Sequence, residues 1–97
     1  MIPPVAGARL VATTAQVEAA YRRLAASIQP AAEGSDCVLL GVLLGGAVPL
    51  VRIAGLLNGD FLIDVCRVGR YGDATRGGIP RWICPPQVAM RGKHVIL

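Results

Sequence analysis

CVLLGVLLGGAVPLVRIAGLLNGDFLIDVC, residues 37–66, carries the clearest pattern of secondary structure in this chain. An apolar run is followed by a Gly-Gly pair, an apolar segment at helical spacing, an Asn-Gly pair and a third apolar run. This order predicts a strand over 38–42, a helix over 47–57 and a second strand over 61–65. Two parallel strands joined by a helix form a right-handed βαβ unit, and the backbone N–H groups at the tip of its first strand are typical of phosphate sites.

The same segment also fits a membrane span. Residues 37–57 are 21 positions with Arg52 as the one charged residue, and a span needs about 20 apolar residues. Against a span, the two glycines and Pro49 interrupt the middle of the segment, and its flanks lack aromatic anchors. We therefore favour the βαβ unit and expect no membrane partner, with a small membrane protein spanning 37–57 as an alternative.

The composition fits one domain, or part of one. The chain has 97 residues, of which 54% are hydrophobic and 16% charged. Such a composition suits a parallel sheet that is apolar on both faces, or a fragment whose apolar surface is covered elsewhere. The three cysteines form no Cys-x-x-Cys pair, so we expect reduced thiols and no zinc site. The start of the chain lacks a secretory signal, and we expect a cytoplasmic protein.

Positive charge gathers in the last third of the chain. Residues 67–97 carry six basic side chains against Asp73 alone, whereas residues 1–66 carry four basic and five acidic ones. Nine of the ten basic residues are arginine, which is suited to a bidentate grip on phosphate. Nucleic acid is a rival partner, but only Tyr71 and Trp82 are there for base stacking. We therefore predict a small anionic ligand and no nucleic-acid partner.

The segment before the βαβ unit predicts one helix. Residues 1–12 are rich in proline and alanine, and we expect an extended lead-in. Thr13 then opens a helix, with Gln16 at capping-box spacing. Pro30 is predicted to end this helix. Residues 1–97 are treated as a single, partial domain.

Two loops are predicted to meet at one edge of the sheet. The loop 43–46 follows the first strand, and the basic residues of 70–76 lie in a glycine-rich segment, 69–78, that predicts a mobile loop. Glycines let consecutive N–H groups face an anion, and a basic loop that closes over the anion excludes water. Short strands are predicted over 81–84 and 94–97, and the last of them ends at the same edge, where ligands bind in open α/β sheets.

Three segments together resemble the purine phosphoribosyltransferases of the hypoxanthine-guanine or xanthine-guanine type. They are VLLGVLLGGAVPL (38–50), FLIDVCRVGRYG (61–72) and MRGKHVIL (90–97). The resemblance covers most of the chain, from Thr13 to Leu97. It implies an α/β, parallel-sheet, Rossmann-like type I phosphoribosyltransferase fold that is incomplete, because the chain ends just before the segment that binds phosphoribosyl pyrophosphate in this family.

The resemblance implies purine salvage, in which ribose 5-phosphate passes from phosphoribosyl pyrophosphate to a purine base with Mg²⁺, in a homo-oligomer such as a dimer. It assigns Leu44, Gly45, Gly46 and Arg76 to the pyrophosphate, and Arg70, Tyr71 and Gly72 to the flexible catalytic loop. Catalytic residues would lie beyond Leu97. We therefore expect little or no catalysis from these 97 residues alone.

The chain departs from the family at Leu44, where the family usually has Lys or Arg. Leucine cannot pair with a pyrophosphate oxygen, so the charge would come from Arg70 or Arg76. The peptide bond before this position is often cis in the family, and we expect a cis bond at Leu43–Leu44. The alternatives are a non-catalytic relative that binds nucleotides or anions, or one that dimerises.

Overall fold

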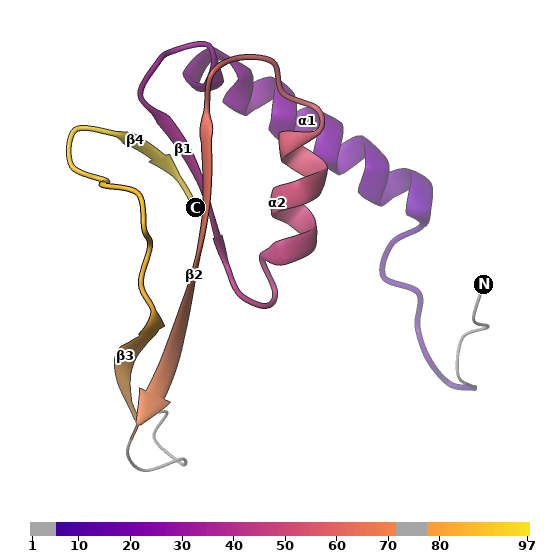
Figure 1. Ribbon diagram of the computed structural model, residues 1–97. Coiled ribbons are helices and arrows are strands. Elements are labelled where there is room, and N and C mark those ends of the chain that lie inside the picture. The colour runs from indigo at the N-terminus through magenta and orange to yellow at the C-terminus, as the bar shows by residue number, and fades with distance from the viewer. Residues whose placement is uncertain (1–5, 72–77) are drawn as a thin grey trace.

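Two helices lie on one face of a four-stranded sheet in the computed structural model, which describes residues 6–71 and 78–97 (Figure 1). The elements are α1 (Thr14–Ala32), β1 (Cys37–Val42), α2 (Ala47–Ala54), β2 (Leu62–Tyr71), β3 (Ile79–Cys84) and β4 (His94–Ile96). The strand order is β3-β2-β1-β4, with β1 parallel to β2 and β4, and β3 antiparallel to β2. The predicted βαβ unit and the α/β class are confirmed.

The core lies between β1 and the two helices. Side chains alternate along a strand, so Cys37 and Leu39 face the helices, and both are buried together with Ala25 and Leu57. Val38 points to the other side of the sheet and is also buried. Burial on both faces is typical of a parallel strand, and it explains the unbroken apolar run at the start of β1.

Helix α1 begins as predicted but ends later. Thr13 Oγ1 accepts a hydrogen bond from Gln16 N at 3.1 Å, and Gln16 Oε1 accepts one from Thr13 N at 2.7 Å, which confirms the capping box. The prediction that Pro30 ends the helix is wrong, because Pro30 lies inside it. A proline removes one backbone donor, but Glu33 N still closes the last turn by donating to Gln29 O at 3.1 Å.

Helix α2 is shorter than predicted. It ends at Ala54 rather than at Leu57, and the N–H of Gly55 donates to Val51 O at 3.1 Å. The chain then makes a tighter turn, in which Leu57 N donates to Ala54 O at 3.3 Å. This turn buries Leu57 in the core, so the apolar side chain packs there although the residue lies just outside the helix.

Arg52 ties α2 to α1. Its guanidinium forms an ion pair with Glu18 and lies 5.1 Å from the centre of the Tyr21 ring. The hydrogen bond from Arg52 holds the pKa of Glu18 below its ordinary value. Both charged side chains remain partly exposed, so we expect the pair to orient the helices more than to stabilise the protein.

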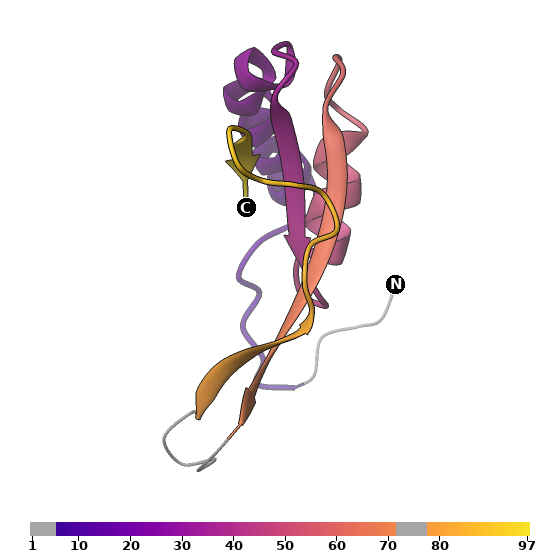
Figure 2. The same ribbon diagram turned by 60° about the vertical axis from the view of Figure 1, so that its left-hand side comes forward.

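Strand β2 runs past the rest of the sheet. In the described residues, β1 pairs with β2 only as far as Val42 and Cys66, and beyond that point β2 pairs with β3. We call β2 from Arg67 to Tyr71, together with β3, the arm. Figure 2 shows the arm projecting from the body formed by β1, β4 and the helices.

The arm corrects the prediction for this part of the chain. A strand ending at Val65 and a loop beginning at Gly69 are wrong, because β2 continues to Tyr71. Antiparallel pairing with β3 supplies the hydrogen-bond partners that carry the strand through Gly69. Positions 72–77 of the predicted mobile loop lie outside the described residues. The predicted strand over 81–84 is confirmed as part of β3, and the strand predicted over 94–97 is confirmed as β4, which ends one residue earlier, at Ile96.

The segment 37–57, considered as an alternative membrane span, folds into β1, a turn and α2. Helix α2 has 8 residues, far fewer than a span requires. No helix within residues 6–71 and 78–97 has both the length and the apolar character needed to cross a membrane.

Residues 85–93, which we call the crossing, carry the chain from the arm to β4. The crossing passes over β2 and β1 on the face opposite the helices (Figure 2). There Asp64 Oδ2 accepts hydrogen bonds from Gln87 N at 2.7 Å and from Val88 N at 2.8 Å. Asp64 Oδ1 accepts another from Val65 N at 2.8 Å. These bonds, the one from Val88 above all, hold the pKa of Asp64 below its ordinary value.

We predict that Asp64 makes the stability of the fold depend on pH, with less stability in acid. A carboxylate with a lowered pKa stabilises the folded state above the pKa of the unfolded chain, about 4, and this contribution is lost as the pH falls through the folded-state pKa. Asp64→Asn should therefore be less stable than the wild type near neutral pH, and the difference should shrink below about pH 4. Urea denaturation over this pH range measures the difference, and a constant difference would contradict the prediction.

Candidate anion-binding site

The loop Leu43–Gly46 lies at the carboxyl end of β1 and leads into α2 (Figure 1). Its first residue is fixed to β2, because Leu43 N donates to Cys66 O at 2.8 Å. Its last residue turns back on β1, because Gly46 N donates to Val42 O at 2.8 Å. The peptide bond Leu43–Leu44 is cis, as the resemblance in sequence predicts. The loop thus stands at the edge where ligands bind in open α/β sheets.

Two glycines permit this reversal of the chain. A Cβ atom on Gly46 would lie 2.8 Å from both N and O of Val42, closer than such atoms pack. A Cβ atom on Gly41 would lie 2.9 Å from Leu50 Cδ2 of α2. The missing side chains therefore let the loop and α2 press against β1. Gly45, by contrast, has open space where a side chain would stand.

The loop leaves two amides for a ligand. Gly46 N–H, expected from the sequence to face the anion, donates to Val42 O instead, and Ala47 N donates to Leu44 O at 3.0 Å. The amides of Leu44 and Gly45 donate to no atom of the described residues, and both residues are exposed. Backbone N–H groups just before a helix, at its positive end, attract anions.

Arg67 is the cation that β2 places beside the loop. It follows Cys66, whose carbonyl oxygen accepts the hydrogen bond from Leu43, and its side chain is exposed. Alternation along β2 turns Arg67 to the side of the sheet that carries α2. The sequence pattern does not single out Arg67, because it lies between the predicted strand, which ends at Val65, and the predicted loop, which begins at Gly69.

The other predicted site residues lie further out. Arg70 is exposed on the arm, about 13 Å along β2 from its last pair with β1 at the usual rise per residue. Tyr71 ends β2, and Gly72 and Arg76 lie outside the described residues. The structure therefore brings Arg67, rather than Arg70, to the loop.

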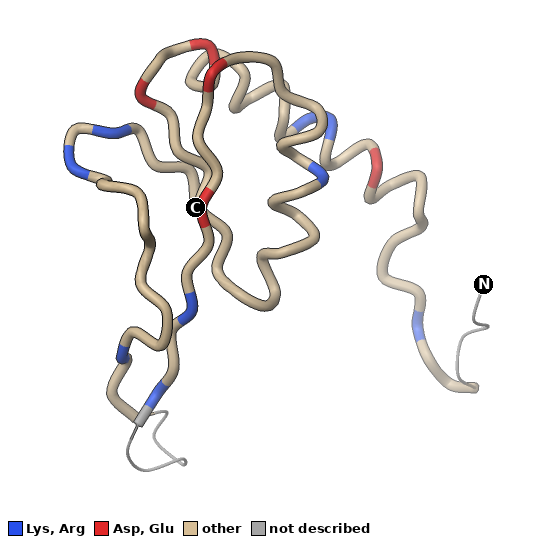
Figure 3. The backbone as a smooth tube through the Cα atoms, viewed as in Figure 1, with Lys and Arg blue, Asp and Glu red and all other residues tan. Residues whose placement is uncertain are grey.

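Charge is mixed at one end of the sheet and positive along the arm (Figure 3). Glu33, Asp36 and Asp60 stand where β1 and β2 begin, at the end opposite to the loop. The basic residues just before β4 lie at that same end, because β4 is parallel to β1 and pairs His94 with Cys37. The described residues of the arm, in contrast, include basic side chains and no acidic ones. An anion is therefore attracted toward the arm and the loop beside it.

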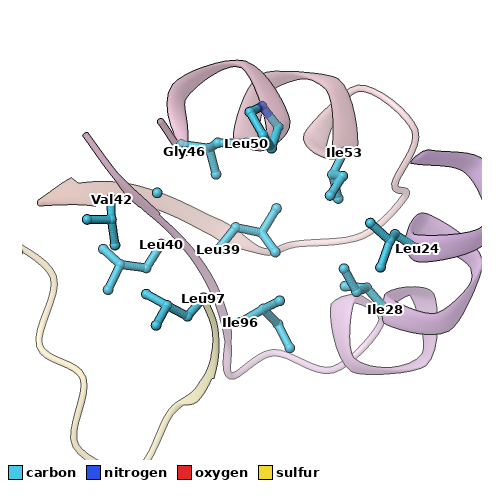
Figure 4. A pocket seen from close by; sticks show the side chains of 12 residues that line it. Leu24, Ile28, Leu39, Leu40, Val42, Gly46, Leu50, Ile53, Ile96 and Leu97 are labelled. Carbon is cyan, nitrogen blue, oxygen red and sulfur yellow. The ribbon is translucent and has the colours of Figure 1, made fainter. Parts of the chain in front are cut away.

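A cavity of about 510 Å³ opens beside the loop (Figure 4). It lies between α1, α2 and the strands β1 and β4, and its lining side chains, such as Leu24, Leu50, Ile53 and Ile96, are all apolar. An apolar wall offers a phosphate group no hydrogen-bond partner. The exposed tip of the loop is therefore a better candidate for an anion site than this cavity.

Within the part of the chain that the structure describes, no group of three or more His, Cys, Asp or Glu side chains is placed to hold a metal ion. Magnesium in proteins takes oxygen ligands from carboxylates together with substrate phosphates. The described residues thus offer no site in which three such side chains hold a metal ion without help from a substrate.

We predict that Gly46→Ala destabilises the chain and that Gly45→Ala does not. A methyl group at Gly46 meets backbone atoms of Val42, and overpacking of this kind costs about 1–3 kcal/mol. A methyl group at Gly45 enters open space. Urea titration gives the free energy of unfolding of both variants, and equal values would show that the close approach at Gly46 is dispensable.

Comparison with known proteins shows which solved structures share this fold. No protein-family model matches the chain, and no curated protein matches its sequence. Solved structures do match: a hypoxanthine-guanine phosphoribosyltransferase from Bacillus anthracis has a TM-score of 0.78 at 25% identity over 91% of this chain. A hypoxanthine phosphoribosyltransferase from Staphylococcus aureus has a TM-score of 0.80 at 20% identity over 90% of it. A purine phosphoribosyltransferase from Pyrococcus horikoshii has a TM-score of 0.64 at 30% identity over 86% of it.

The chain spans about half the length of these three structures, with 52%, 48% and 51% of each covered. Its mostly parallel sheet matches the type I phosphoribosyltransferase fold. The resemblance that three segments of the sequence indicate is thus confirmed at the level of the fold, and over about 90% of its residues this chain has the fold of the purine phosphoribosyltransferases.

Proposed function

We propose that this chain provides the pyrophosphate-binding part of a phosphoribosyltransferase that joins a purine base to phosphoribosyl pyrophosphate, as in purine salvage. The observation that carries the proposal is the loop Leu43–Gly46, whose exposed Leu44 and Gly45 amides have no partner among the described residues. The names of the similar structures, which specify hypoxanthine, guanine or purine, support the class of base.

The chemistry of the transfer fits such a loop. The reaction breaks the bond between ribose and pyrophosphate, so negative charge grows on the departing pyrophosphate. Amides that are already oriented toward an oxygen stabilise this charge without first having to move. The first turn of α2 adds the positive end of a helix. The role of this chain in the reaction is therefore to bind the leaving group and to lower its energy.

Arginines take the place of the cation that is missing at Leu44. The Leu44 side chain is 71% exposed and brings no charge to the loop. We assign Arg67 to the pyrophosphate as the nearest strand-borne cation, with Arg70 from the arm and Arg76 from the sequence as further partners. Guanidinium groups bind phosphate oxygens through paired hydrogen bonds.

The remaining steps are assigned to other parts of the working enzyme. The chain spans about half of the similar structures, and no group of three or more His, Cys, Asp or Glu side chains is placed to hold a metal ion among its described residues. We propose that ribose, base and Mg²⁺ are held elsewhere. We also propose that Tyr71, the last residue of β2, leads into the loop that the resemblance in sequence assigns, with Gly72, to closure over the substrate. A chain that binds pyrophosphate but takes part in no transfer would be the anion-binding relative that the sequence leaves open.

The cytoplasmic location and the homo-oligomeric state remain predictions. The three cysteines are free, with Cys37 and Cys66 buried and Cys84 exposed, which fits a reducing cytoplasm. Strands β3 and β4 form the edges of the described sheet, and an open edge permits pairing with a second copy in a homo-oligomer.

The proposal predicts saturable binding of pyrophosphate by the 97-residue chain, measured by isothermal titration calorimetry. Arg67→Ala should weaken binding about tenfold, because charge-assisted hydrogen bonds are lost. Arg22→Ala removes an equal charge from the exposed face of α1 and should change the affinity by less than about twofold. Absence of binding by the wild type would refute the proposal, and equal effects of the two variants would refute the role of Arg67.

Leu44→Lys tests the missing cation by restoring it. The position is exposed, so lysine fits without repacking, and it should tighten pyrophosphate binding about tenfold by placing an ammonium group near the anion. Val51→Lys, at a 69% exposed position on α2, adds the same charge away from the loop. An equal gain in both variants would mean that affinity follows net charge and that Leu44 is not at the site.

A further inference from the structure

The direction of the arm depends on how its two strands are held where they leave the sheet. A two-stranded hairpin without further cover is marginally stable, so its direction is set where it leaves the sheet. Strand β2 is fixed there by β1, whose last pair joins Val42 to Cys66. A register shift between Arg67 and Val68 follows at once, and such irregularities bend and twist a strand. The arm therefore needs a second anchor, at the end of β3.

Asp64 supplies this anchor. It lies opposite Leu40, in the part of β2 that β1 holds. Its Oδ2 atom accepts hydrogen bonds from Gln87 N at 2.7 Å and Val88 N at 2.8 Å. Among the described residues, Asp64 is the one side chain of the body or of β2 that hydrogen-bonds the crossing. One carboxylate thus ties the crossing to the fixed part of the sheet.

The connection from this anchor to the arm is short and stiff. Strand β3 ends at Cys84, and Pro85 and Pro86 alone separate it from Gln87. A proline ring fixes its own φ and restricts the residue before it. Hydrogen bonds that hold Gln87 in place therefore leave the end of β3 little freedom to move.

We propose that Asp64 is a positioning residue, which through Gln87 and the two prolines fixes the direction of the arm and so the position of Arg70 relative to the loop Leu43–Gly46. The positioning of the arm follows from the hydrogen bonds of Asp64. Its consequence, a higher affinity for pyrophosphate, rests on the proposed function.

Trp82 provides a probe of the arm in the full chain. It is the single tryptophan, it lies on β3, and it is 59% exposed, so time-resolved fluorescence anisotropy follows the motion of the arm. Asp64→Ala should increase the amplitude of nanosecond motion. Asp64→Asn should restore most of the wild-type anisotropy, because one amide oxygen can still accept from both Gln87 N and Val88 N.

Asp60→Asn is the matched control. It removes the same charge from an exposed residue just before β2 and should leave the anisotropy unchanged. Circular dichroism selects a temperature at which all variants are folded. If Asp64→Ala lowers the melting temperature but gives the wild-type anisotropy in the folded protein, Asp64 is a structural residue only and the inference is overturned.

Titration with pyrophosphate tests whether the position of the arm affects the affinity for this ligand. Asp64→Ala should weaken binding about fivefold, Asp64→Asn should weaken it less, and Asp60→Asn should not weaken it. Unchanged affinity in Asp64→Ala together with a loosened arm would overturn the link between the arm and the site. If the wild type itself binds no pyrophosphate, the proposed function fails, whereas the Trp82 anisotropy still decides whether Asp64 positions the arm.

Discussion

The close return of the chain onto β1 at Gly46 sets how α2, the core and the loop are arranged around the sheet. Gly46 N donates to Val42 O at 2.8 Å, and no side chain fits between this residue and the Val42 backbone. Because the turn is so tight, α2 starts directly against the sheet and brings its apolar face to Leu39 and the core. The same turn uses the amide of Gly46 internally and leaves those of Leu44 and Gly45 exposed. One steric constraint thus places the helix, the core and the candidate anion donors.

The two faces of the sheet are covered by different means. Helices α1 and α2 cover one face with apolar side chains, whereas the irregular crossing passes over the other (Figure 2). A segment without regular structure must find partners for its backbone N–H groups, and the Asp64 carboxylate accepts from Gln87 N and Val88 N. Val38 is fully buried, although it faces away from the helices. A single polar anchor therefore helps to complete a face that no described helix covers.

The sequence predicts those parts of the fold that depend on local pattern. The apolar run of β1, the glycine turn and the capping box at Thr13 are all decided by neighbouring residues, and the resemblance to a family adds the cis bond at Leu43–Leu44. The arm could not be predicted in this way, because Gly69 is a poor strand former that β3 alone holds in a ladder. The hydrogen-bond partners of Asp64 could not be predicted either, since they lie 23 and 24 residues further along the chain.

The candidate site combines donors from two strands. The loop after β1 supplies backbone amides, which do not depend on the identity of the side chain at Leu44, and β2 supplies the guanidinium of Arg67. The two are joined where Leu43 N donates to Cys66 O, one residue from the loop tip on one side and one residue from Arg67 on the other. On the proposed function, an apolar residue at Leu44 is therefore tolerated as long as β2 keeps its place beside β1. The charge of the site then depends on the position of a strand rather than on a loop side chain, which is why anchors on β2 bear on the affinity for an anion.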